Sequence, residues 1–118
     1  YDDFLKYNPG ANSWEKIPIT SGPGDRSGTK AIAVGDHAYF YGGTKYTQGA
    51  LGYYYRQINE CWRYDLIRNT WEEYAYCPVP ELLSYGAIFS TDRGFILFGG
   101  RNGEDFDYTN KMVEFIEE

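Results

Sequence analysis

The stretch ECWRYDLIRNTW, residues 60–71, decides the fold, because residues 3–14 carry the same pattern as DFLKYNPGANSW. The two segments align without a gap at a displacement of 57 residues. A tyrosine and a tryptophan recur at matching places, as Tyr7 and Trp14 in the first segment and as Tyr64 and Trp71 in the second. A fixed period of about 50 residues is typical of radial or solenoidal arrays of repeated units.

A second matched pattern uses the same displacement. The apolar run HAYFY at residues 37–41 ends in Gly42-Gly43, and FILF at residues 95–98 ends in Gly99-Gly100. Glycine tolerates backbone angles and close approaches that a Cβ atom prevents. Each Gly-Gly pair therefore indicates that the backbone at the end of the strand adopts such angles, or approaches a neighbour so closely, that a residue with a Cβ atom would not fit there.

The composition is that of an all-β protein. Aromatic residues make up 19% of the chain, with 14 glycines between short apolar runs, and aromatic enrichment favours half-buried pleated surfaces. No segment keeps a helical period over the length of a helix. We expect Thr44–Gln57 and Arg101–Thr109 to be loops. We expect nine strands, at residues 3–7, 13–17, 30–34, 37–41, 60–65, 70–76, 87–90, 95–98 and 111–116.

An apolar strand ending in Gly-Gly, followed after a spacer by Tyr, six residues and Trp, resembles the kelch repeat. HAYFYGG with RYDLIRNTW is the complete copy here, whereas the last copy has FILFGG and carries Phe115 in place of the tyrosine. The resemblance implies a kelch-type β-propeller with four antiparallel strands per blade, named a to d from the axis outward. It divides the chain into the end of one blade at 1–19, a complete blade at 27–77 and most of a third repeat at 84–118.

About two blades are present in this division, and propellers close with four to eight. We expect the remaining blades to be present in cis in a longer protein. A second hypothesis is a ring assembled in trans from two-blade subunits, and a third is an array that does not close.

Charge and cysteine content bear on partners and compartment. The net charge is −6 and the basic residues are scattered, so we expect no nucleic-acid partner. No apolar window is long enough to span a membrane, so we expect no membrane partner. Pairing Tyr64 with Trp71 places Cys61 opposite Tyr74 rather than Cys77, which favours two thiols. With no glycosylation sequon present, these features predict a cytoplasmic or otherwise intracellular protein.

No catalytic constellation is visible in the sequence. His37 is the only histidine and cannot by itself build a histidine metal cluster. The adjacent acidic pairs, such as Glu72-Glu73, point to opposite faces of a strand, and no phosphate-binding glycine loop is present. We therefore expect no enzyme activity, metal or cofactor in these residues. The alternative is a fragment of a propeller enzyme or glycan-binding propeller whose active residues lie in other blades.

The long b–c and d–a loops emerge on one face of a propeller, and function tends to reside in such loops. The resemblance implies a protein–protein interaction scaffold or adaptor, and many kelch domains grip acidic or mixed-charge peptides through arginines on this face. The alternatives are that Tyr53–Tyr55 simply begin strand c, and that the arginines are ordinary solvated side chains. The predicted binding residues are Arg26, Tyr46, Tyr53, Tyr54, Tyr55, Arg56, Arg101, Glu104 and Asp105.

Overall fold

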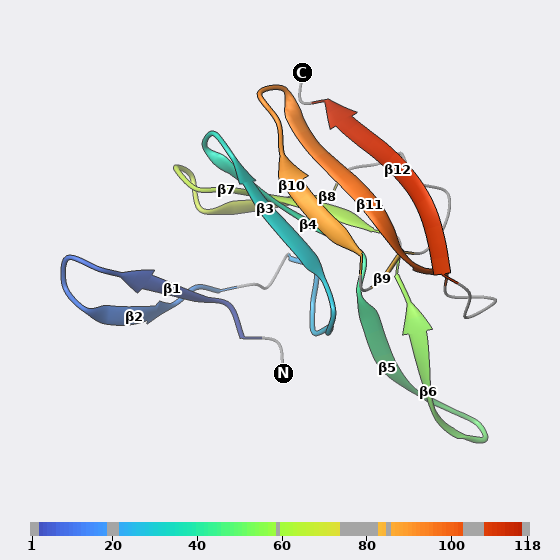
Figure 1. Cartoon of the computed structure of the whole chain (residues 1–118). Helices are drawn as coiled ribbons and strands as arrows, with labels where there is room; N and C mark the ends of the chain where they lie inside the picture. Colours follow the sequence, from blue (N-terminus) through green and yellow to red (C-terminus); the bar gives the residue numbers. More distant parts are fainter. Residues whose placement is uncertain are drawn as a thin grey trace.

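The computed structural model describes residues 3–18, 22–58, 60–73, 83–84, 86–102 and 108–116. Every regular element in this part of the chain is a strand, and every strand pairing is antiparallel, so the all-β prediction is confirmed (Figure 1). The twelve strands are β1 (Leu5–Asn8), β2 (Ser13–Lys16), β3 (Lys30–Val34), β4 (His37–Tyr41), β5 (Thr44–Gly49), β6 (Gly52–Gln57), β7 (Cys61–Asp65), β8 (Thr70–Glu73), β9 (Leu83–Ser84), β10 (Ala87–Ser90), β11 (Gly94–Asn102) and β12 (Tyr108–Ile116).

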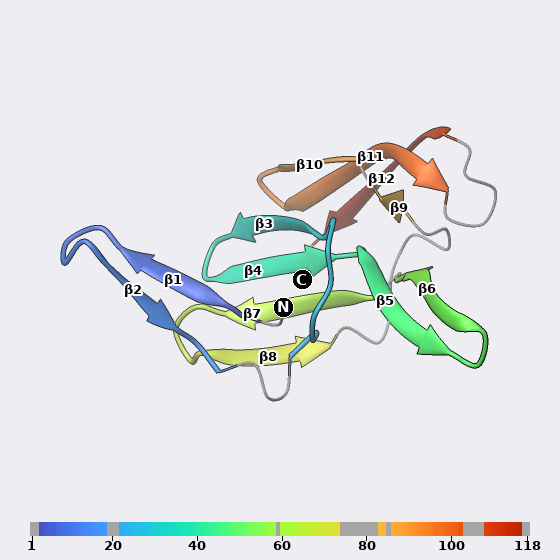
Figure 2. The same cartoon turned by 90° about the horizontal axis from the view of Figure 1, so that it is seen from below.

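Three sheets follow the repeat along the chain. The complete sheet has the order β3-β4-β7-β8, which matches four strands placed in sequence from a to d. A hairpin of β1 and β2 precedes it, and β10-β11-β12 follow it with β9 paired to β11. Figure 2 shows β10, β11 and β12 as a layer above the complete sheet, with the β1–β2 hairpin projecting beyond one end of that sheet.

The turns between strands c and d repeat in detail at the displacement of 57 residues. Asn8 Oδ1 accepts hydrogen bonds from the amides of the β1–β2 turn, and Asp65 Oδ1 does the same in the β7–β8 turn. Asn12 and Asn69 both adopt left-handed backbone angles, with φ of 48° and 56°. Tyr7 Oη donates to Asn12 Oδ1 over 2.7 Å, and Tyr64 Oη donates to Asn69 Oδ1 over 2.8 Å. The repeated tyrosine therefore holds this turn closed and does not only supply packing area.

The main core lies between the complete sheet and the β10–β12 sheet. Tyr39, Tyr41, Cys61, Phe95 and Leu97 are its buried residues. The Tyr39 ring packs on Phe95 and Phe115, with ring centroids 5.3 and 5.2 Å apart, in the tilted arrangement that aromatic pairs favour. On the other side of the complete sheet, the Phe4 ring stands edge-on against Phe40, Tyr64 and Trp71.

The prediction of a loop at Thr44–Gln57 is wrong, because these residues form the β5–β6 hairpin. The backbone continues the ladder between β4 and β7 past Gly42-Gly43: Gly42 N donates to Glu60 O, and Ile58 N donates to Gly43 O. Both glycines have positive φ, of 70° and 109°, which lets the strand bend without ending the pairing.

The third repeat uses the same device. β11 passes through Gly99-Gly100 with a bulge and runs to Asn102, so the strand extends beyond the predicted Phe98 end. β12 likewise begins at Tyr108 rather than at Lys111, which shortens the predicted Arg101–Thr109 loop. The sequence prediction of nine strands omitted β5, β6 and β9.

Candidate functional site

The candidate site is the β5–β6 hairpin, called the arm below, which projects from the complete sheet (Figures 1 and 2). Its strands pair from Thr44 opposite Gln57 to Gly49 opposite Gly52, with Ala50 and Leu51 forming the tip. Alternate residues along a strand point to opposite faces. One face of the arm therefore carries Tyr46, Gln48 and Tyr53, and the opposite face carries Lys45, Thr47, Tyr54 and Arg56.

Three tyrosines of the arm are exposed to solvent. Tyr46 and Tyr53 stack on one face with ring centroids 4.8 Å apart and planes 13° apart. Tyr54 lies on the other face against the backbone of Gly49, where a Cβ atom would come within 2.9 Å of its ring. The exposed fractions are 53% for Tyr46, 60% for Tyr53 and 50% for Tyr54.

The tip of the arm is uncharged and apolar. Leu51 is fully exposed at the turn. A shallow hollow lies beside it, lined by Gly49, Ala50, Leu51, Gly52, Tyr53 and Tyr54. An exposed leucine among aromatic rings at the end of a projecting hairpin is the kind of apolar feature that marks interaction surfaces.

Arg26 fixes the base of the arm. Its guanidinium bonds to Glu60 Oε2 over 2.7 Å and to the carbonyl oxygens of Pro23 and Gly42, and its side chain is only 8% exposed. Glu60 Oε2 also accepts a hydrogen bond from Trp62 Nε1. Partial burial works to raise the pKa of Glu60, but the hydrogen bonds from Arg26 and Trp62 outweigh it and hold the pKa below its ordinary value.

Backbone pairing supports the same junction. Ser27 and Thr44 exchange two backbone hydrogen bonds, of 3.0 and 2.7 Å. Gly43 lies so close to this segment that a Cβ atom would come within 2.5 Å of Thr29 Oγ1. The loop that precedes β3 is therefore joined to the first residue of the arm, and the arm leaves the sheet in a set direction.

The structure brings together five of the nine predicted binding residues on one hairpin: Tyr46, Tyr53, Tyr54, Tyr55 and Arg56. Arg101 lies in β11 opposite Tyr108 and Ser84. Glu104 and Asp105 lie outside the described residues. The expectation that Arg26 contacts a partner stays a prediction; the alternative of a solvated arginine does not fit its buried side chain.

The sequence interpretation missed Lys45. The β5–β6 register places Lys45 directly opposite Arg56 on the face that carries Tyr54. Only the strand pairing identifies this neighbour, because Lys45 and Arg56 are eleven positions apart in the sequence. Tyr53–Tyr55 lie in β6, and the ladder of β4 with β7 continues toward β5 and β6 past Gly42-Gly43, so the alternative that these tyrosines begin strand c stays a prediction.

Other exposed aromatics occupy positions that the repeat uses to pack blade on blade. Tyr7 and Trp14 are 44% and 67% exposed, whereas Phe4 covers their counterparts Tyr64 and Trp71. At the other end, Phe98 is 46% exposed, and its counterpart 57 residues earlier, Tyr41, is buried in the core. The arm tyrosines have no such packing counterpart, so blade packing does not account for their exposure.

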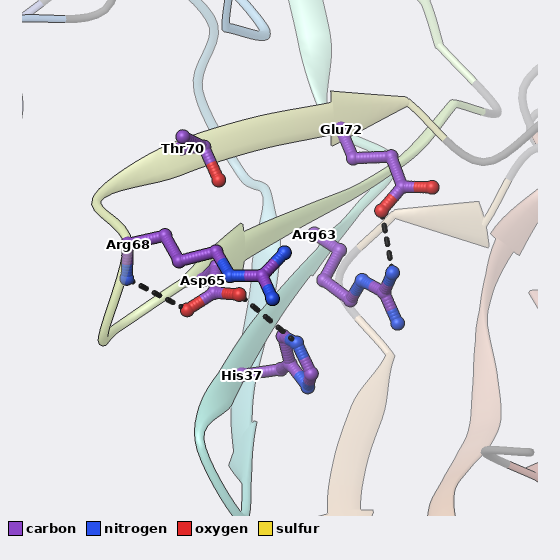
Figure 3. Close-up of a pocket in the computed structure, with 6 residues that line it drawn as sticks. All are labelled: His37, Arg63, Asp65, Arg68, Thr70 and Glu72. Atoms are coloured by element: carbon purple, nitrogen blue, oxygen red, sulfur yellow. Dashed lines mark hydrogen bonds and ion pairs between the residues drawn. The ribbon is translucent and has the colours of Figure 1, made fainter.

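A second hollow, of about 340 Å³, lies along the complete sheet (Figure 3). An ion pair and a histidine–carboxylate contact cross it: Arg63 Nη2 lies 2.5 Å from Glu72 Oε2, and His37 Nε2 lies 3.7 Å from Asp65 Oδ2. The backbone amides of Arg68 and Ile67 donate to Asp65 and lower its pKa, with His37 adding to the effect. Its remaining lining residues are Arg68 and Thr70.

The lining of this hollow carries both acidic and basic side chains, which is typical of an ordinary solvated surface. Within the described ranges, no group of three or more His, Cys, Asp or Glu side chains is placed to hold a metal ion. In the same part of the chain, no helix could cross a membrane.

Repeated four-stranded sheets that pack face to face through aromatic rings define a protein of the propeller-blade class. No protein-family model matches the chain. The chain is similar to Kelch domain-containing protein 2 from Homo sapiens, with 30% identity over 106 residues that cover 88% of this chain and 25% of the relative. It is also similar to N-acetylneuraminate epimerase from Vibrio cholerae, with 27% identity over 103 residues that cover 87% of this chain and 26% of that protein.

The chain is therefore related to the kelch-repeat proteins, and its sheets are kelch-type blades of a partial propeller. It spans about a quarter of the length of the curated relatives it matches.

Proposed function

We propose that this chain is part of a protein–protein interaction module that binds its partner through the β5–β6 arm. The observation that carries the proposal is the exposed cluster of Tyr46, Tyr53 and Tyr54 on a projecting hairpin. Tyrosine and arginine are enriched at interaction hot spots because they give large contact area and directional hydrogen bonds. Repeat positions that pack blade on blade account for the exposure of Tyr7, Trp14 and Phe98, and the arm tyrosines occupy other positions.

The fixed base of the arm supports the proposal. A binding surface that is already ordered loses less conformational entropy when the partner arrives. Arg26, Glu60 and the Ser27–Thr44 pairing hold the junction through buried or backbone contacts. These groups act as positioning residues in this account, whereas Tyr46, Tyr53, Tyr54 and Arg56 contact the partner.

The experiment places a photo-reactive phenylalanine analogue at position 53 and, as a control, at position 108 of the protein in its native cells. Tyr108 is a suitable control because it is 86% exposed on β12, outside the arm. We expect a discrete cross-linked protein from position 53, whose purified form binds the wild-type protein and loses about tenfold or more in affinity when Tyr46 and Tyr53 are changed to Ser. Equal affinity for the variant would refute the proposal.

The epimerase relative favours a second candidate, an enzyme acting on an acylated amino sugar. This candidate predicts that the purified protein interconverts N-acetylneuraminate anomers or epimers faster than buffer does, with or without an intact arm. Turnover that survives the Tyr46→Ser, Tyr53→Ser variant, without a cross-linked partner, would replace the interaction proposal by the enzyme.

A further inference from the structure

The arm is uncharged between two basic residues. Ten consecutive residues, 46–55, carry no acidic or basic side chain, and Lys45 and Arg56 stand at their two ends. The strand register places these two cations directly opposite each other at the base of the arm. The chain as a whole has a net charge of −6, so this positive collar is a local feature.

The collar has no close acidic partner within the described residues, and Arg56 acts on Glu60 only through a longer-range attraction that helps to lower the pKa of that carboxyl. Like charges placed directly opposite each other on a sheet destabilise it. Neither Lys45 nor Arg56 forms an ion pair with a described carboxylate, and Glu60 Oε2 at the arm base is already bonded to Arg26 and Trp62. An anionic group between the two cations would remove their repulsion and gain two charge-assisted contacts.

Between the collar and the tip, the same face of the arm carries first an aromatic side chain and then two glycines, which leave the backbone uncovered. Tyr54 lies one pair further out than the collar on this face, and Gly49 and Gly52 follow without side chains. Gly49, Gly52 and Tyr54 line the hollow, which ends at the fully exposed Leu51. An extended peptide can thus lie along this face with its backbone close to the arm.

An uncharged aromatic surface of this kind suits proline. A polyproline II segment has carbonyl groups that no internal hydrogen bond uses, and tyrosine hydroxyls can donate to them. Its rings pack on aromatic side chains, and the segment is already extended before binding, so little entropy is lost.

We propose that the arm binds an extended, proline-containing peptide segment that carries an acidic residue three positions from the proline seated on Tyr54. Polyproline II has three residues per turn, so residues three apart share one face of the segment and lie about 9.3 Å apart along it. Two residues along β6 separate Tyr54 from Arg56, a rise of about 6.7 Å. The long side chains of Lys45 and Arg56 span the remaining distance, so the acidic side chain reaches the Lys45–Arg56 collar when the proline ring lies on Tyr54. An apolar residue on the far side of the proline lies over the tip hollow.

This inference rests on the proposed function and names the chemistry of its partner. Neutral saccharides would use the tyrosines but leave the collar unsatisfied. An anionic membrane would use the collar and Leu51 but not the spacing between an acid and a proline. Both are separate outcomes of the experiment.

The probe is a fluorescein-labelled decapeptide of alternating alanine and proline with one glutamate three positions after a central proline. Its controls replace the glutamate by glutamine or every proline by alanine. Fluorescence anisotropy measures binding to the wild-type protein and to the variants Tyr54→Ser, Lys45→Gln with Arg56→Gln, and Tyr108→Ser. Hydrogen exchange of the β5 and β6 amides checks that each variant keeps the arm folded.

We expect the parent peptide to bind and its affinity to fall about tenfold for Tyr54→Ser and for the proline-free peptide. The glutamine peptide and the collar variant are each expected to lose about fivefold, and combining them should lose no more, because both changes remove the same contact. Tyr108→Ser should bind like the wild type.

Equal binding of the proline-free peptide, or equal loss for Tyr108→Ser, would overturn the inference. Absence of binding at millimolar protein with a folded arm would overturn it as well. Binding of phosphatidylserine vesicles that depends on Leu51 and the collar, without peptide binding, would assign the arm to a membrane surface. If the peptide fails but the partner cross-linked from position 53 still requires the arm, this inference falls and the proposed function stands.

Discussion

Replacing Arg26 by Met should loosen the base of the arm while leaving the rest of the blade folded. Met keeps much of the length and apolar volume of the side chain but removes the bonds to Glu60, Gly42 and Pro23. A hydrogen bond to a charged group contributes about 1.5–3 kcal/mol and one between neutral groups about 1 kcal/mol. Glu60 keeps 36% of its side chain exposed, so water can replace part of the loss. We expect the free energy of unfolding to fall by about 2–3 kcal/mol.

Arg93→Met is the matched control. Arg93 forms a two-point ion pair with Glu114, at 2.9 and 3.1 Å, but its side chain is 60% exposed. Exposed ion pairs contribute about 0–1 kcal/mol, so this variant should lose little stability. Urea denaturation followed by tryptophan fluorescence measures both variants at the same ionic strength.

The stability difference between wild type and Arg26→Met should also depend on pH. The pKa of Glu60 lies below its ordinary value in the folded protein, so its contribution is present above the unfolded pKa and is lost as pH falls through the folded pKa. The difference should be largest near neutral pH and shrink below about pH 4. Hydrogen exchange at Thr44 should be faster in Arg26→Met. A variant no less stable than Arg93→Met, or a difference that does not shrink in acid, would refute the role assigned to Arg26.

Four further substitutions test the fold that carries the arm. Gly43→Ala should lower the free energy of unfolding by about 2–4 kcal/mol in urea titrations, because φ is 109° and the new Cβ meets Thr29 Oγ1 at 2.5 Å; a loss below about 1 kcal/mol would show that this backbone relaxes freely. Tyr39→Ala should cost about 3–5 kcal/mol by thermal denaturation, since the ring is fully buried between two sheets, and a surface-like loss would contradict the position of the core. Tyr64→Phe should cost about 1 kcal/mol by removing the bond to Asn69, and Tyr7→Phe should cost less because its bond to Asn12 is exposed; the reverse order in urea titrations would contradict the burial argument.

Much of the fold could be predicted because the repeat displays the same physical requirement more than once. Tyr64 and Trp71 recur as Tyr7 and Trp14, and both tyrosines hold equivalent turns through an asparagine. The Gly-Gly pairs mark positions with two successive positive φ angles, which side chains disfavour. Recurrent residues of this kind can be identified from the sequence alone, because their role does not depend on which strand lies next to them in the sheet.

The arm was missed although its local signal was present. Tyr and Thr favour strands, and both are frequent in Thr44–Gln57. The turn Gly49-Ala50-Leu51-Gly52 lacks the Asn-Gly or Asp-Gly pair that usually identifies a two-residue hairpin. The glycines in this segment therefore suggested a loop.

Other features of the site depend on contacts between distant residues. Arg26 is 34 positions from Glu60, and charged side chains are ordinarily exposed, so its burial could not be read from the sequence. Lys45 becomes a neighbour of Arg56 only when the strand register is known. Arg26 and Glu60 position the arm, whereas Lys45 and Arg56 lie on its surface, and only the contacts in the structure distinguish these two roles.

The most direct test of the account replaces residues 46–55 by an Asn-Gly turn and measures the affinity for the partner cross-linked from position 53. The change removes the tyrosine cluster and the tip but keeps Lys45, Arg56 and the Arg26 junction. The account predicts that the urea midpoint of the blades stays unchanged. It also predicts that the affinity for the partner falls at least tenfold, which is the loss expected when two hot-spot tyrosines are removed. Unchanged affinity in a folded protein would contradict the claim that the arm is the binding surface.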